Sequence, residues 1–453
     1  MINKIQRLIK KLASDKLFFN GAMIFFFVMA GNFFNYLFQI AMSRSLSVSD
    51  YGTLNSLLSL LVITSVPAGA LTAFSAKNIS HNLAGGDILG VRKFIKYALG
   101  RTFLYDCLFL AVFVIGIPLL MKFMKIDSYF YYIITGLAIF LTFPFSLLLG
   151  SLQGSRMYLS LGLFSSLSSI IKFILAVALV YAGLNVVGAL FSVAVSPLLI
   201  MAAAAIVLFL YLKNKQDETG EKQKHINNDK TKENGLKTGR FYFLSLFCIL
   251  LFFTFYTNID LIAVKHFFPA YKTGIYSVAD ILGKIILYFP SAIVLVMFPE
   301  VSHAHATNNK TKHILLKTVF MTFLMCSILE IFYIFFPDKI VSFLMGAKYI
   351  TSAPLLTLYG LSMFPFAFIN IFINYFMAVN NSKILIYMFL FSLIEILLFY
   401  LFHYSLREII LTVMITGWVV MLSLSIHVFY KELSMLLKRF LHSINRIIPI
   451  NSN

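Results

Sequence analysis

The stretch SVADILGKIILYFP, residues 277–290, is apolar enough for a membrane-spanning helix, yet it carries Asp280 and Lys284. A charge at bilayer depth costs at least about 2.5 kcal/mol, so such residues usually line a cavity or pair with one another. Asp280 and Lys284 stand at i and i+4 on one helix face, where they can pair. The sequence leaves two interpretations open: a local ion pair, or a pair that faces a cavity and lets the lysine reach an anionic ligand.

The composition of the whole chain indicates a membrane protein. Of the 453 residues, 60% are hydrophobic and only 12% are charged, whereas soluble domains are about 45–50% apolar and about 25% charged. The net charge of +19 could suggest nucleic acid, but no soluble region is large enough to present a folded basic face. The three cysteines lie in apolar runs without ligand-pair spacing, so neither a disulfide nor a metal site is predicted. We expect no cofactor and no nucleic-acid partner.

Twelve runs of about 20 mainly apolar residues, the length that crosses a bilayer, predict an all-α integral membrane protein. These runs are roughly 17–42, 51–76, 100–121, 128–152, 157–182, 184–212, 240–264, 272–298, 314–336, 351–378, 384–404 and 407–430. A polar segment with the composition of a disordered linker separates six spans from six. We therefore expect an N-terminal lobe over 1–212, a linker over 213–239, a C-terminal lobe over 240–430 and a basic cytoplasmic tail over 431–453.

The distribution of lysine and arginine predicts the orientation of the spans. With the N-terminus in the cytoplasm, inner segments hold 27 of the 37 lysines and arginines and outer loops hold eight. The two others, Lys172 and Lys284, lie within spans. Because cytoplasmic loops carry the excess of positive charge, we expect a multi-pass protein of the cytoplasmic membrane with both termini in the cytoplasm.

The two halves of the chain resemble each other. DYG (50–52) aligns with KTG (272–274), Pro67 with Pro290, and IIKFILA (170–176) with LIEILLF (393–399), at offsets of 222–223 residues. Six spans preserve orientation, so we expect two parallel six-helix repeats related by an axis along the membrane normal. Repeats of this kind are typical of transporters, whose substrate site lies at the repeat interface. The predicted fold is thus two lobes around a central cavity.

One segment also resembles a known family. Residues 258–302, NIDLIAVKHFFPAYKTGIYSVADILGKIILYFPSAIVLVMFPEVS, resemble the polysaccharide flippases of the multidrug/oligosaccharidyl-lipid/polysaccharide exporter superfamily. The shared elements are Asp260, Gly274-Ile-Tyr276, the Leu-Gly-Lys of 282–284 and the Phe-Pro of 298–299. YLFQIAMSRSLSVSDYGTLNSLLSLL (36–61), with its Tyr-Gly pair at the start of the second span, and GSLQGSRMY (150–158) are similar to the same family.

The resemblance implies a flippase, not an enzyme. Its substrate would be a polyprenyl-diphosphate-linked oligosaccharide for an O-antigen, capsule, exopolysaccharide or teichuronic-type polymer, moved by alternating access. Membrane lipids and other polysaccharide-assembly proteins would be its partners. Two alternatives stay open: a cation or drug antiporter of the same superfamily, and a polysaccharide polymerase or ligase, which the short outer loops disfavour. No GxxxxGK[ST] nucleotide-binding motif is present, so energy would come from a membrane potential, an ion gradient or consumption of the product.

Charged residues near the middle of spans are the candidate substrate-binding residues. Lys172, on the fifth span, has no acidic residue within one turn, so its partner must be on another helix, in a water-filled cavity or on a ligand. Glu395 occupies the matching position of the second half, and the two could form a salt bridge between the lobes. Together with Asp280 and Lys284 they form the candidate cavity site.

A second group of charges lies near the outer ends of spans, where long side chains reach water at little cost. Arg44, Asp260 and Lys265 are the candidate outer-gate residues, and Arg44 aligns with Lys265 in the repeat. Glu330 and Asp106 lack any supporting pattern and are interpreted as helix-packing charges.

Overall fold

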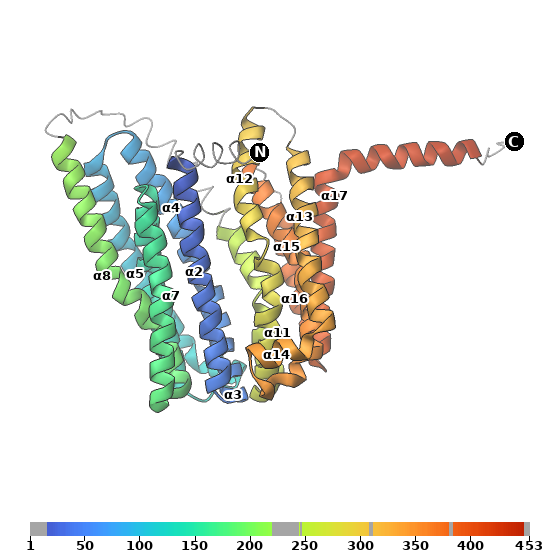
Figure 1. Ribbon diagram of the computed structural model, residues 1–453, viewed down its shortest axis with the longest axis horizontal. Helices are drawn as coiled ribbons and strands as arrows, with labels where there is room; N and C mark the ends of the chain where they lie inside the picture. Colours follow the sequence, from blue (N-terminus) through green and yellow to red (C-terminus); the bar gives the residue numbers. More distant parts are fainter. Residues whose placement is uncertain (1–15, 220–243, 245–246, 308–310, 380–383, 448–453) are drawn as a thin grey trace, which may run out of the picture. The chain divides into compact units, whose positions relative to one another are not determined.

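The structure, a computed structural model, describes residues 16–219, 244, 247–307, 311–379 and 384–447 (Figure 1). Within these ranges the chain forms helices and no strand. The helices of the first half are α2 (Lys16–Ser45), α3 (Val48–Thr64), α4 (Val66–Ala84), α5 (Ile88–Met124), α6 (Tyr129–Gly154), α7 (Tyr158–Leu179), η1 (Val180–Leu184) and α8 (Asn185–Thr219). Those of the second half are α10 (Ile259–Phe267), α11 (Ala270–Tyr288), α12 (Ser291–Ala306), α13 (Lys312–Phe335), α14 (Pro337–Leu344), η2 (Ala347–Ser352), α15 (Ala353–Ala378), α16 (Ile384–Leu401) and α17 (Leu406–Ile447).

The predicted all-α membrane fold is confirmed. Over the described residues, eight helices are long and apolar enough to cross a membrane, and a bent pair, Phe247–Tyr256 with Ile259–Phe267, makes a ninth span. One of the eight, Tyr158–Lys215, contains both α7 and α8. Counting these separately, and adding α2 and the α11–α12 pair, gives the twelve spans expected from the sequence.

The repeat is visible in how the second span of each half is broken. α3 ends at Thr64 and α4 resumes with Pro67 in its first turn. α11 ends at Tyr288, and α12 begins directly after Pro290. Proline lacks the backbone N–H that continues a helix, so it is accommodated at the start of a new one. The aligned prolines therefore interrupt the same span at the same place in both halves.

The contacts group the chain into two units. One contains residues up to 281 together with 338–353, and the other contains 282–337 and 354 onward. These limits differ from the predicted lobes, whose boundaries stay a prediction. α8 continues to Thr219, into the start of the predicted linker. Residues 220–239 of that linker and residues 448–453 of the predicted tail lie outside the described residues.

The first unit is held together by helix pairs whose small residues allow close approach. α2 packs along α7, α4 along α6, and α8 against both α6 and α7. Gly150 and Gly154 of α6 form a G-x-x-x-G motif whose Cβ positions would lie 2.5 Å and 2.6 Å from the carbonyl oxygens of Thr72 and Ala76. Such close packing is what associates helices in lipid, where apolar transfer contributes little.

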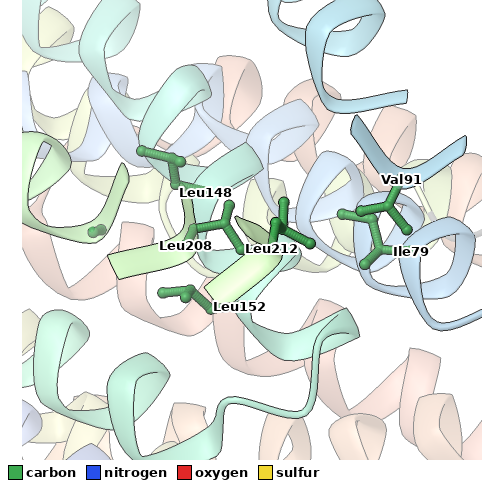
Figure 2. Packing of buried hydrophobic residues seen from close by; sticks show 7 residues of the cluster. Ile79, Val91, Leu148, Leu152, Leu208 and Leu212 are labelled. Carbon is green, nitrogen blue, oxygen red and sulfur yellow. The ribbon is translucent and has the colours of Figure 1, made fainter. Parts of the chain in front are cut away.

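A compact apolar cluster fills the space among four of these helices. Figure 2 shows its side chains converging from α4, α5, α6 and α8. Its buried members are Ile79, Val91, Leu148, Leu152, Ala204, Leu208 and Leu212. This cluster positions α8, and through it α7, which carries Lys172.

The second unit contains α12, α13 and α15–α17, with the end of α11. α16 packs along α17, and α12 along α13. Trp418 of α17 stacks on Phe364 of α15 with ring centroids 6.4 Å apart. Figure 1 shows that α17 bends, so that its last part runs away from the helices of this unit.

Candidate functional site

Lys172 of α7 binds a neutral partner on a neighbouring helix. Its Nζ donates a hydrogen bond to Oδ1 of Asn35 on α2, and it lies 4.9 Å from the ring centroid of Phe38. The lysine is half-buried. Among the residues that the structure describes, it has no acidic partner. Of the three partners that the sequence left open, the structure shows one on another helix, the side-chain amide of Asn35.

The close packing of α2 on α7 fixes this pair. Phe34 and Phe173, each one residue from the pair, have ring centroids 5.9 Å apart. One to two turns away, Gly31 lies so close to α7 that a Cβ would be 3.4 Å from Cα of Ser166. At 1.5 Å per residue, Lys172 is about 21 Å from Tyr158 and about 11 Å from Leu179, the two ends of α7. It therefore lies within the span, nearer the Leu179 end than the predicted middle.

Glu395 is fully buried in the second unit. Its Oε1 accepts a hydrogen bond of 3.5 Å from Oγ1 of Thr416, which places the carboxylate between α16 and α17. Lys172 and Glu395 belong to different units, so the salt bridge between them stays a prediction.

Asp280 and Lys284 are both buried on α11, with exposed fractions of 3% and 9%. α11 is buried on nearly every face from Thr273 to Leu287. This burial is compatible with both interpretations that the sequence left open, a local pair and a pair that faces a cavity.

At the other end of α2, the predicted gate residue Arg44 contacts a segment from the second half of the chain. Its guanidinium donates to the carbonyl oxygens of Phe343 and Leu344 in the last turn of α14. Lys348 of η2 donates in return to the carbonyl oxygens of Arg44 and Leu46, at 3.1 Å and 2.6 Å. The last carbonyls of a helix have no partner within it, and cations near them are favourable. Arg44 thus caps the end of α14, and Lys348 of η2 caps the end of α2, an arrangement that we call the reciprocal cap.

Further contacts surround the reciprocal cap. The hydroxyl of Ser43 donates to the carbonyl oxygen of Met345 at 3.2 Å. The buried rings of Tyr51 and Tyr349 pack with centroids 5.6 Å apart. The segment 338–353 belongs to the first unit because of such contacts.

The other two predicted gate residues are buried and have neutral partners. Asp260 of α10 accepts a hydrogen bond of 2.8 Å from the hydroxyl of Tyr276 on α11. Lys265 donates to Oγ1 of Thr53 on α3 at 3.3 Å. They thus join α10 to α11 and α3, whereas Arg44 binds α14.

Two aligned glycines meet where α3 and α11 cross. A Cβ on Gly52 would lie 2.5 Å from the backbone nitrogen of Gly274, and Gly274 in turn approaches Val48. These glycines occupy equivalent positions of the repeat, DYG and KTG. Two positions that align in the repeat are therefore in direct backbone contact.

Sequence reasoning missed Asn35 and Lys348. Asn35 is an amide inside an apolar run, and polar residues at that depth are expected to have a role, so it carried a usable signal. Lys348 is one of the eight outer-loop cations and was not among the predicted gate residues. Its bonds join residues more than 300 positions apart in sequence, and nothing local indicates them.

No family model and no curated protein matches the chain, but solved structures do. An inward-facing multidrug resistance MATE family transporter of the MOP superfamily has a TM-score of 0.69 at 15% identity, covering 88% of this chain and 94% of that one. The lipid II flippase MurJ in an inward closed conformation has a TM-score of 0.66 at 17% identity, covering 90% and 87%. A MOP superfamily transporter from Pyrococcus furiosus, described by its reversed binding-pocket polarity, has a TM-score of 0.61 at 16% identity, covering 89% and 93%. The chain therefore has the fold of MOP superfamily transporters.

Proposed function

We propose that the protein is a flippase of the cytoplasmic membrane that translocates a polyprenyl-diphosphate-linked oligosaccharide for a cell-surface polysaccharide. The observation that carries the proposal is Lys172, a cation inside a span whose partner is the neutral Asn35. A lysine neutralised by a carboxylate has little to offer an anion. Lys172 has no carboxylate partner among the described residues, and the amide of Asn35 uses only one of its three N–H donors.

A diphosphate is a suitable ligand for such a group. Hydrogen bonds between ionised partners are roughly twice as strong as those between neutral ones. Asn35 and Phe38 fix the ammonium group from one side, which reduces the ordering cost when an anion binds. Lys284 is the second cation that the sequence predicts inside a span.

The contacts at the predicted outer ends of the spans support a gate for alternating access, in which the lobes rock about the substrate site. The reciprocal cap formed by Arg44 and Lys348 joins α2 to α14 through backbone carbonyls alone, so it can break and re-form without leaving an unpaired buried charge. The close backbone contact of Gly52 and Gly274 is a candidate pivot, because it leaves no room for either helix to move toward the other.

The second candidate function is a cation or drug antiporter. It is favoured by buried acidic residues such as Glu395, which could bind a cation, and by the likeness to the MATE transporter. The two functions differ in the residues that bind substrate: the flippase requires Lys172, whereas the antiporter requires acids.

The test is to measure lipid-linked sugars in cells that lack the gene and carry wild type, Lys172→Met or Lys172→Arg. We expect a complete polyprenyl-diphosphate oligosaccharide to accumulate on the cytoplasmic face, and to be cleared by wild type and in part by Lys172→Arg but not by Lys172→Met. If no such lipid accumulates and the cells instead become sensitive to cationic compounds, the flippase is refuted in favour of the antiporter.

A further inference from the structure

The buried face of α13 is polar, although α13 is a membrane span. Thr318, Thr322, Cys326 and Glu330 follow one another at four-residue spacing, with Tyr333 one turn further, and all are buried. Residues at this spacing share one helix face. Polar side chains inside a membrane bundle are rare and usually functional.

Most of these groups have partners. The hydroxyl of Tyr333 donates to the carbonyl oxygen of Leu282 at 2.6 Å. The thiol of Cys326 donates to the carbonyl oxygen of Ile286 at 3.6 Å. Thr318 donates to a carbonyl of its own helix. Three polar atoms of this face have no hydrogen-bond partner in the part of the chain that the structure describes: both carboxyl oxygens of Glu330 and the hydroxyl of Thr322.

The Glu330 carboxyl has its own space in the packing. Its side chain is 4% exposed and points at Gly360 of α15, where any Cβ would overlap Oε2. The residue at 360 therefore leaves room for the carboxyl between α13 and α15.

The neighbouring titratable groups supply no countercharge. On α13 they are Cys326 and Tyr333, and on α15 Tyr359, whose ring packs on Gly283 of α11. On α11, Leu282 and Ile286 lie on the face that contacts α13. Lys284 is two residues from each, so it lies about 200° around the helix from Leu282, on the face opposite α13. Among the described residues, no charged side chain acts on Glu330.

An ionised carboxylate in this place would be a buried charge with neither counterion nor hydrogen bond, which costs several kcal/mol. A protonated carboxyl avoids that cost. We propose that Glu330 is a proton-binding site: it carries a proton while α13 is packed on α11 and α15, and releases it to water when these helices separate. Binding and release are simple transfers between water and one carboxyl oxygen. That this couples a proton gradient to transport rests on the proposed function, whereas the proton site itself does not.

Infrared difference spectroscopy tests the site directly. Glu330→Gln is nearly isosteric and neutral, so it should fold. At neutral pH the wild-type minus Glu330→Gln spectrum should contain the carbonyl band of a carboxylic acid, and raising the pH should convert it to carboxylate bands. Only carboxylate bands at neutral pH would overturn the proposal.

Cys326, one turn from Glu330, reports on the packing. In a variant without Cys107 and Cys248, a small maleimide should label Cys326 more at about pH 9 than at about pH 6, a range in which buried carboxyls titrate. The rise should exceed that in Glu330→Gln by about tenfold, the factor that one pH unit of linked titration gives. Asp106→Asn, another buried acid, should keep the wild-type rise.

The outcomes separate the site from the function. Equal labelling of wild type and Glu330→Gln across this range would refute the link between protonation and packing. If both the band and the labelling behave as expected, but a pH gradient drives transport equally in wild type and Glu330→Gln, the proton site stands and its coupling to transport is refuted.

Discussion

Alanine at Gly52 provides a sharp test of the close contact between Gly52 and Gly274. The added Cβ would lie 2.5 Å from the nitrogen of Gly274, 2.7 Å from the carbonyl oxygen of Ala270 and 2.9 Å from Cα of Gly274. Ordinary contacts begin at 3.4 Å, so α3 and α11 must separate by about 1 Å at their crossing, and all three obstacles are backbone atoms. Overpacking of this kind costs about 1–3 kcal/mol. In Gly274→Ala the added Cβ would overlap the carbonyl oxygen of Val48, so this variant should be destabilised in the same way.

The assay is thermal unfolding of the purified protein in detergent, followed by transport. Gly69→Ala is the matched control, because a Cβ there meets nothing within 4 Å, and alanine is a better helix former by about 0.8–1 kcal/mol. We expect Gly69→Ala to be as stable as wild type or more so, and Gly52→Ala to unfold at a lower temperature and to transport more slowly. If Gly52→Ala is as stable as Gly69→Ala, the close crossing of the repeats at these glycines is wrong.

Three further predictions concern the site residues. Lys172→Met should keep the fold but lower transport by about 10- to 150-fold, because a hydrogen bond to a charged group contributes about 1.5–3 kcal/mol. Asn35→Leu removes only the amide that orients the lysine, so it should lower transport less. Equal transport rates for wild type, Lys172→Met and Asn35→Leu would contradict the anion-site assignment. For the reciprocal cap, a cysteine placed beneath it should be labelled more from the outer side in Arg44→Ala and in Lys348→Ala than in wild type. In a double-mutant cycle the two effects should not be additive. Strictly additive effects would mean that the two cations do not act in one cap. Glu395→Leu should lower the free energy of unfolding by about 1–3 kcal/mol through loss of the α16–α17 bond, whereas Glu395→Gln should retain most of it, and unfolding curves that coincide for the two variants would exclude a structural role for that bond.

Much of the fold could be predicted from the sequence because the bilayer imposes it. Every backbone group must be bonded internally in lipid, so apolar runs of span length become helices. The repeat was visible at Pro67 and Pro290 because proline acts on backbone hydrogen bonding at its own position. These signals are local, and the structure confirms them.

The site was less predictable because its contacts are distant in sequence. A charge in an apolar run identified Lys172, but only packing of α2 on α7 shows that its partner is Asn35. Asp260 and Lys265 were predicted near Arg44 from their depth, which says nothing about which helix each side chain faces. The reciprocal cap of Arg44 and Lys348 depends on α14, a short helix inside what the sequence indicated as a loop.

The central claim is that the protein translocates a lipid-linked anion with the help of Lys172. The most direct test reconstitutes the purified protein in vesicles with a polyprenyl-diphosphate oligosaccharide and measures how fast the sugar becomes accessible to an enzyme outside. The account predicts translocation by wild type that a non-transportable diphosphate lipid inhibits, and a rate near that of empty vesicles for Lys172→Met. Translocation that is unchanged in Lys172→Met, or a wild-type rate no higher than that of empty vesicles, would contradict it.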